Sequence, residues 1–191
     1  LLTYGTAYRA VVERLATGPG DSILLMGGGK GTSFVGAQIA KSLEGEIVKV
    51  SNNGRRLGKG AAIRCAASRA SGSLILFMDA DLASDPAHVR HLVERLEKGA
   101  DMVIGSRYLK ESKAKRKMIR HFASKSFNTL VQAMFGSKIS DHQCGFKAFR
   151  KETVLPVIEQ VEDGRWFWDA ELLVRAQWEG LKVEEIPIAW K

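Results

Sequence analysis

Short apolar runs that alternate with helical patterns are the feature that most limits what this chain can fold into. Each run is bounded by Gly, Asp or Asn, and such runs predict strands at 22–26, 46–50, 74–78 and 101–105. Helical periodicity between and after them predicts helices at 33–43, 60–70 and 87–98. This alternation is typical of an α/β fold, in which a mainly parallel sheet carries helices on both faces.

The pattern changes after residue 110. An amphipathic helix is predicted over about 118–135, with Met118, Phe122, Phe127, Leu130, Val131 and Met134 near one stripe. Two further helices near 152–161 and 168–179 precede a last strand, VEEIPIAW. The chain has 191 residues, of which 45% are hydrophobic and 26% charged, so we expect a single globular domain over 1–191.

Two carboxylates, Asp79 and Asp81, follow the apolar run 74–78 with one residue between them. Ligands of open parallel sheets bind beyond the carboxyl ends of the strands, and residues two apart in extended chain point the same way. Carboxylates so placed suit Mg²⁺ or Mn²⁺, which fills its remaining positions with water and phosphate oxygens. The alternative is that these carboxylates only cap a helix and lie in a solvated turn, which is the favoured interpretation of a D-x-D pattern that stands alone.

Glycine-rich sequence at 52–64, NNGRRLGKGAAIR, precedes a helix of small residues. Glycine lets the backbone approach a ligand closely, and a helix N-terminus favours anions. Lys59 adds a positive charge, so Gly58, Lys59 and Gly60 are candidates for phosphate binding. A flexible loop that leads into a helix is the alternative.

Three later segments carry further candidates. Arg107 follows the strand 101–105 and offers a forked donor for phosphate, and Asp141 precedes a glycine turn in SDHQCGFKAFR. Asp169 and Glu171 lie at a predicted helix start, where carboxylates stabilise the helix dipole without any further role.

The formal net charge of +8 attracts nucleic acid, anionic lipid or phosphorylated small molecules. Residues 110–125 concentrate it, with seven Lys or Arg against one Glu. Followed by an apolar helix stripe, this run could lie on an anionic membrane surface, or it could lead into an ordinary core helix. A basic nucleic-acid-binding module is a weaker alternative because no recognition-helix, zinc or RNA-binding signature is present, so we expect no nucleic-acid partner.

Six segments in order resemble family 2 glycosyltransferases that act on polyprenyl phosphates, the group that includes dolichyl-phosphate mannose synthase and dolichyl-phosphate glucosyltransferase. The resemblance extends from about Asn53 to the end of the chain. The segments are GKGAAIR, LFMDADL, VIGSRY, DHQCGFKAFR, WDAELL and VEEIPIAW. The resemblance implies a GT-A fold with a Rossmann-like sheet. It also implies inverting transfer of a hexose from UDP-glucose or GDP-mannose to a polyprenyl or dolichyl phosphate.

The resemblance also assigns residues to roles. Asp79 and Asp81 correspond to the D-x-D element that binds Mg²⁺ or Mn²⁺, with Asp81 the more direct ligand, and Asp141 lies near the reacting sugar. Arg107 and Arg120 match basic residues for donor and acceptor phosphates. The donor site would further include Asn53, Gly58, Lys59 and Gly60.

Elementary chemistry agrees with these roles. The acceptor phosphate is already anionic, the metal would stabilise the departing nucleoside diphosphate, and arginines would offset the repulsion between the two anions. The two cysteines, Cys65 and Cys144, lie far apart without metal-ligand spacing, and no run is long enough for a membrane span. We therefore expect a cytoplasmic protein, peripheral on the cytosolic face of a membrane.

The beginning of the chain departs from the family pattern. The opening LLTYGTAY provides at most a stub of the family's first strand, and GGGKGT after SILLM lacks the expected aspartate. We therefore expect an incomplete N-terminal strand and an altered nucleotide pocket. GGGKGT also resembles the glycine-rich signature of sugar-phosphate nucleotidylyltransferases, which is the alternative enzyme class, although no later segment supports it.

Overall fold

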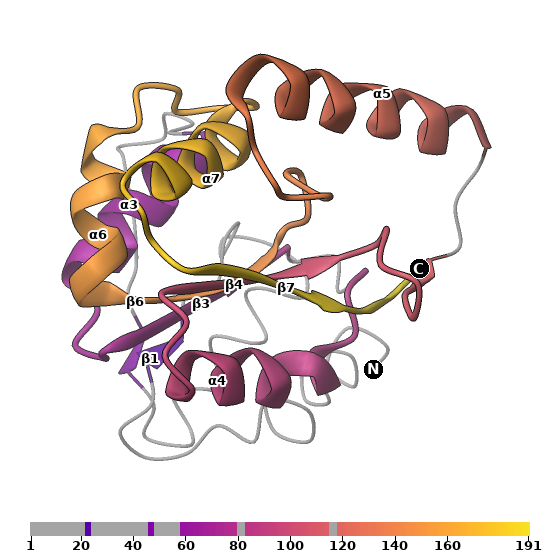
Figure 1. The fold of residues 1–191 in the computed structure, drawn as a ribbon. Coiled ribbons are helices and arrows are strands. Elements are labelled where there is room, and N and C mark those ends of the chain that lie inside the picture. Colours follow the sequence, from indigo (N-terminus) through magenta and orange to yellow (C-terminus); the bar gives the residue numbers. More distant parts are fainter. Residues whose placement is uncertain (1–21, 24–45, 48–57, 80–82, 115–117) are drawn as a thin grey trace.

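The computed structural model describes residues 22–23, 46–47, 58–79, 83–114 and 118–191 (Figure 1). The predicted helix 33–43, and most of the predicted strands 22–26 and 46–50, lie outside these residues. The strands are β1 Ser22–Ile23, β2 Glu46–Ile47, β3 Leu74–Met78, β4 Met102–Ser106, β5 Lys113–Ala114, β6 Phe146–Arg150, β7 Val183–Pro187 and β8 Ala189–Trp190. The helices are α3 Lys59–Arg69, the 3₁₀ turn η2 Pro86–His88, α4 Val89–Glu97, α5 Met118–Phe135, α6 Lys151–Gln160 and α7 Trp168–Trp178.

The central sheet has the strand order β3-β6-β4-β7. Strands β4 and β7 are parallel, whereas β6 runs antiparallel to both of its neighbours, β3 and β4. Two short parallel pairs, β1 with β2 and β5 with β8, accompany it. The α/β expectation is therefore confirmed, and the central sheet in the described residues is mixed because the antiparallel strand β6 is inserted between β3 and β4.

Strand β6, FKAFR, escapes prediction because two of its five residues are basic. Lys147 is nevertheless fully buried, since its ammonium donates to the carbonyls of His142 and Cys144 and to Asp169. An interior lysine is tolerated only when its charge is paired and hydrogen-bonded. The position of β6 matters for the site, because an antiparallel strand begins where its neighbours end.

Helices cover both faces of the sheet, as predicted (Figure 1). On one face α3, α6 and α7 pack over a core that includes Ile63, Phe77, Phe149 and Trp168. On the other face α4 contributes Leu92 and Leu96 to a second apolar cluster. All five residues of β4 are buried because apolar layers cover both sides of that strand.

Helix α5 lies on the same side of the sheet as α7 (Figure 1). Its Val131 packs with Ala170 and Val174 of α7, and Phe127 and Phe135 flank that contact. The predicted stripe is thereby divided between two sides of the helix, because its other apolar residues are exposed. The exposed residues of the stripe are Met118, Phe122, Leu130 and Met134, and Ile119, which is not part of the stripe, is also exposed. None of the described helices combines the length and apolar character needed to cross a bilayer.

Candidate functional site

Polar side chains gather where β3 and β4 end and β6 begins. Asp79 follows β3, Arg107 follows β4, and the loop that carries Asp141 leads into β6. Residue Met78 pairs with Phe146, and the Asp79 amide donates to the Gly145 carbonyl at 3.0 Å. The antiparallel register of β6 therefore places this loop beside both strand ends.

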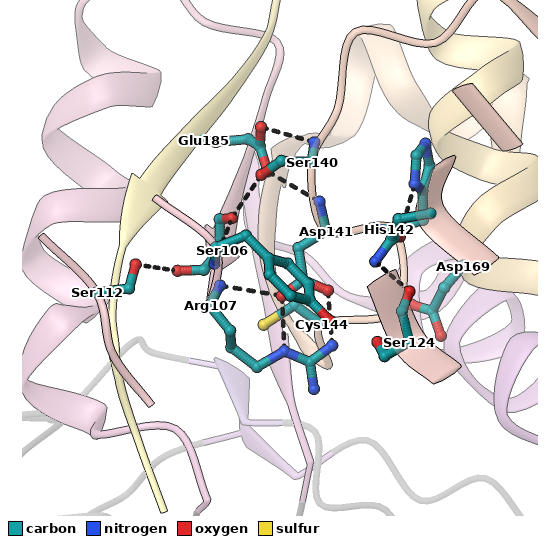
Figure 2. Close-up of polar contacts among 12 residues, drawn as sticks. Ser106, Arg107, Ser112, Ser124, Ser140, Asp141, His142, Cys144, Asp169 and Glu185 are labelled. Atoms are coloured by element: carbon teal, nitrogen blue, oxygen red, sulfur yellow. Dashed lines mark hydrogen bonds and ion pairs between the residues drawn. The ribbon is translucent and has the colours of Figure 1, made fainter. Parts of the chain in front are cut away.

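Arg107 and Asp141 form a forked ion pair in this cluster (Figure 2). The guanidinium Nε and Nη2 each donate to a separate Asp141 oxygen at 2.6 Å, and the Arg107 amide donates to the same carboxylate at 3.0 Å. Asp141 is fully buried. Burial alone would lower the pKa of Arg107, but hydrogen bonding and charge attraction from Asp141 raise it above its ordinary value. The arginine is therefore a fixed, permanently charged donor.

Glu185 of β7 supports the loop from the other side (Figure 2). Its carboxylate accepts from the Ser140 amide at 2.9 Å, the Ser140 hydroxyl at 2.7 Å and the Asp141 amide at 3.2 Å. The Ser140 hydroxyl also lies 2.8 Å from that of Ser106 at the end of β4. Glu185 thus fixes the backbone from which Asp141 reaches Arg107.

A second cluster of charges joins α3, β3, β6 and α7. Lys59, the first residue of α3, pairs with Asp169 at 2.9 Å and with Asp79 at 3.3 Å. The buried ammonium of Lys147 lies 2.7 Å from the other Asp169 oxygen. Both ammonium groups also lie 5.8 Å from the centre of the Phe77 ring, within the range of a cation–π contact.

These pairings favour the charged forms of Asp169 and Lys59. Burial would raise the pKa of Asp169, but Lys147 and Lys59 hold it below its ordinary value. Burial would likewise lower the pKa of Lys59, and the attraction of Asp169 and Asp79 outweighs it, so the pKa of Lys59 is raised. Asp169 is therefore a buried anion that holds one lysine inside the core and another at its edge.

Asp79 is the most exposed of these groups, with 49% of its side chain accessible. A Cβ atom added at Gly145 would overlap its carboxylate, so Gly145 provides the space in which that carboxylate lies. A half-exposed carboxylate is the hard oxygen ligand that Mg²⁺ and Mn²⁺ prefer, and Asp79 therefore fits a divalent cation. The described residues contain no group of three potential metal ligands, and Asp81 falls outside them.

Glycines shape the N-terminus of α3. Gly58 has a φ of +83°, which L side chains rarely adopt, and the amide of Gly60 donates to the Gly164 carbonyl. A side chain at Gly60 would overlap the indole of Trp168. These two glycines therefore let the start of α3, and Lys59 with it, lie close to α7.

His142 and Cys144 occupy the buried interior of the Asp141 loop. The ring of His142 lies 2.9 Å from Asn128 Oδ1 and 2.8 Å from the Ser137 hydroxyl. Burial and the charge of Lys147 lower the pKa of His142 to about 4, and burial raises the pKa of Cys144 to about 11. The ring and the thiol are therefore neutral near pH 7, and both serve the structure of the loop.

Comparison with known sequences agrees with this geometry: residues 8–155 match the family described as "Glycosyl transferase family 2". The chain belongs to that family. It is 37% identical over 193 residues to the glycosyltransferase AglD of Haloferax volcanii, covering 99% of this chain and 31% of that protein. It is 35% identical over 158 residues to the dolichyl-phosphate beta-glucosyltransferase of Saccharomyces cerevisiae, covering 75% of this chain and 46% of the yeast protein. This family 2 chain thus spans less than half the length of either relative.

Solved structures confirm the GT-A-like fold. Glucosyl-3-phosphoglycerate synthase from Mycobacterium tuberculosis superposes with a TM-score of 0.65 at 16% identity, covering 99% of this chain and 67% of the synthase. The same enzyme with Mn²⁺, UDP-glucose and glycerol 3-phosphate gives a TM-score of 0.57 at 14% identity, covering 97% and 68%. At these identities the likeness establishes the fold of this family 2 domain.

The structure brings part of the predicted site together. Gly58, Lys59, Gly60, Asp79, Arg107 and Asp141 all lie around the ends of β3 and β4 and the N-terminus of α3. Asn53 and Asp81 lie outside the described residues, and of Arg120 only its place in α5 is described.

Sequence reasoning does not predict the observed contacts of three residues in the site. Lys147 and Glu185 lie within strands, and Asp169 reads as an ordinary charge at a helix start. The contacts of Glu171 are structural, because it accepts from the amides of Glu162 and Asp163 in the segment before α7 and pairs with Arg175. The signal for Asp169 would have been a basic residue, Lys147, inside an otherwise apolar strand, which requires a buried anion nearby.

Proposed function

We propose that this domain transfers glucose from UDP-glucose to a polyprenyl phosphate such as dolichyl phosphate, with inversion at the anomeric carbon. The observation that carries the proposal is the fixed fork of Arg107 and Asp141 at the end of β4, together with Lys59 and Asp79 at the end of β3. Such a site offers cations to two anions, which an enzyme that joins a phosphate acceptor to a diphosphate donor must bring together.

The relatives support the donor, the acceptor and the stereochemistry. The yeast protein is named a dolichyl-phosphate beta-glucosyltransferase, and the mycobacterial synthase is described in complex with UDP-glucose and Mn²⁺. The glucose of UDP-glucose is α-linked, so a β-linked product requires inversion. A single displacement by an acceptor phosphate, which is anionic at neutral pH, meets that requirement without a strong general base.

Arg107 is the residue that we assign to the phosphate groups. Its Nε and Nη2 bind Asp141, and Nη1 makes no hydrogen bond within the part of the chain that the structure describes. The guanidinium also stacks 5.6 Å from the Trp190 ring, which limits its rotation. Because Arg107 engages both Asp141 oxygens, we assign Asp141 to position Arg107 and not to act as a base.

A divalent cation completes the donor site in this proposal. Asp79, together with Asp81, would hold it, and when bound the cation stabilises the departing diphosphate. Lys59 lies 3.3 Å from Asp79 and supplies a further positive charge there. Gly58 and Gly60 let the backbone at the start of α3 come close to the donor.

Helix α5 provides the contact with the lipid surface. Its exposed apolar side chains include Ile119, with 85% of its surface accessible, and Phe122, with 61%. Lys125 and Arg120 belong to the same helix, which follows the basic segment 110–117. Apolar and basic residues on one helix suit the interface of an anionic membrane, so the domain would bind the cytosolic face peripherally, close to its acceptor phosphate.

The experiment is a transfer assay with radiolabelled UDP-glucose and dolichyl phosphate in anionic vesicles, with and without Mn²⁺. We expect a glucosylated lipid that requires the cation, and a higher melting temperature with UDP-glucose and Mn²⁺ together, because a ligand at a hundred times its Kd stabilises by about 2.7 kcal/mol. Arg107→Met should abolish transfer while the exposed control Arg90→Met should not. Transfer from GDP-mannose alone would replace the donor, and no lipid product with either donor would overturn the proposal.

A further inference from the structure

Lys59 occupies the position beside Asp79 where a positive ion would otherwise lie. Its ammonium lies between two carboxylates, 3.3 Å from an Asp79 oxygen and 2.9 Å from an Asp169 oxygen. It is also the first residue of α3, so its backbone is fixed, and only 25% of its side chain is accessible. Asp79 therefore already has a cation that belongs to the chain.

The described charges of this cluster are balanced without any ligand. Asp79 and Asp169 provide two negative charges, and Lys59 and Lys147 provide two positive ones. Lys147 is fully buried and has three acceptors, so it stays in place. Any divalent cation that joins Asp79 therefore adds two positive charges next to Lys59 that these four side chains do not offset.

We propose that Lys59 is a built-in counter-ion of Asp79, and that it makes binding of the divalent cation depend on the donor diphosphate. This inference rests on the proposed function and adds a coupling role for one residue of its site. The repulsion acts over a few ångströms in a partly buried site, where like charges interact strongly. The diphosphate of a nucleotide-sugar carries two negative charges, so its arrival offsets the charge of the cation and gives the Lys59 ammonium a new partner.

Asp169 determines where Lys59 remains during this exchange. One Asp169 oxygen binds Lys147 and the other binds Lys59, so Lys59 keeps a buried anchor when it leaves Asp79. The ammonium then needs only a small movement of its flexible stem to reach a phosphate beside Asp79. Cation and nucleotide are thereby coupled, and the coupling is reciprocal by thermodynamic linkage.

The test measures binding and needs no turnover. Mn²⁺ is titrated into the wild-type domain, Lys59→Met and Lys59→Arg, with and without saturating UDP, and free Mn²⁺ is read by electron paramagnetic resonance. In Lys59→Met, Mn²⁺ alone should bind roughly tenfold tighter than in the wild type, and the factor by which UDP tightens Mn²⁺ should fall to a similar extent. Lys59→Arg retains the charge and should behave like the wild type.

Two controls make the result specific. Lys98→Met removes an exposed lysine at the end of α4 and should leave both affinities unchanged. Lys59→Gln is a polar second variant, and near-ultraviolet circular dichroism shows that each variant is folded. If folded Lys59→Met and Lys59→Gln bind Mn²⁺ alone no tighter than the wild type does, the inference is wrong. If the wild type binds no Mn²⁺ even with UDP, both the inference and the proposed cation site are wrong.

Discussion

The guanidinium of Arg107 forms a forked pair with the carboxylate of Asp141, with its Nε and Nη2 each 2.6 Å from a different oxygen. The aspartate is fully buried, and only 10% of the arginine side chain is accessible. Two residues separated by 34 positions in sequence thus form one rigid unit. Arg107, which we propose binds the substrate phosphates, is therefore oriented before any substrate arrives, and this reduces the entropy cost of binding.

Replacement of Asp141 should expose how much the domain depends on this unit. Asp141→Asn leaves the partly buried Arg107 charge without a full counter-ion, so we expect the free energy of unfolding to fall by about 3 kcal/mol. Urea unfolding followed by circular dichroism measures this change. The double variant with Arg107→Met should lose less than the sum of the two single changes, because the partners share one interaction. Strict additivity would show that the pair contributes no coupling energy.

Local periodicity accounts for the elements that the sequence predicts well. The run 74–78 coincides with β3 and the amphipathic pattern 118–135 with α5, because the spacing of apolar residues indicates the type and extent of an element. The burial of α5 could not be predicted in the same way. Its apolar positions surround much of the helix, and only the docking of Val131 on α7 decides which of them are covered.

The site was predictable where local motifs mark it, at strand ends, at the glycine-rich start of α3 and in the loop that carries Asp141. Asp79 and Arg107 directly follow apolar runs, so their place at one edge of the sheet could be inferred. Asp169 and Lys147 lie 22 residues apart on different elements, and their pairing depends on the insertion of β6 between β3 and β4. That insertion depends on pairing between strands far apart in sequence, which local apolar periodicity does not predict.

Glu185 should affect catalysis through the loop that it holds. Glu185→Gln weakens the acceptor for the Ser140 and Asp141 amides, and each lost charge-assisted bond costs roughly 1–2 kcal/mol. We therefore expect kcat/KM for transfer to fall about tenfold or more, with the larger part in kcat because Arg107 loses its fixed orientation. The neighbouring Glu184→Gln removes only half-exposed ion pairs with Arg95 and Lys182 and is the matched control. Equal activity of both variants would contradict the role of Glu185.

The buried ring of His142 should make stability depend on pH. Its pKa in the folded protein is about 4, because burial and the charge of Lys147 disfavour the protonated ring, whereas an unfolded histidine titrates near 6.5. Between these pH values the unfolded chain therefore binds more protons than the folded one. The contribution of His142 to the free energy of unfolding is fully present above about pH 6.5 and is lost as the pH falls toward 4.

Over that window the loss should be on the order of 3 kcal/mol. Urea titrations from pH 7.5 to 4.5 measure it, and His142→Asn should flatten the slope while preserving a polar contact with the Ser137 hydroxyl. A slope in His142→Asn as steep as in the wild type would assign the pH dependence to other groups.

Gly145 should affect cation binding more than it affects the stability of the fold. An added Cβ would overlap the Asp79 carboxylate, which is half exposed and can move aside, so we expect Gly145→Ala to lose less than about 1 kcal/mol of stability. The displaced carboxylate should reduce Mn²⁺ affinity in the presence of UDP by roughly tenfold. Gly72→Ala, where an added Cβ meets only a carbonyl at 3.4 Å, is the control. Unchanged Mn²⁺ affinity in Gly145→Ala would argue against Asp79 as a ligand.

The exposed side of α5 should determine attachment to vesicles. Ile119→Ser combined with Phe122→Ser removes two large apolar side chains that are 85% and 61% accessible. Because burial of each such side chain is worth about 1.5–3 kcal/mol at most, binding to anionic vesicles in a co-sedimentation assay should weaken at least tenfold. Melting temperature should change little, since neither side chain is buried in the fold. The paired control Arg90→Ser and Glu94→Ser alters α4, on the other face of the sheet, and should bind as the wild type does. Equal binding by both double variants would move the membrane contact away from α5.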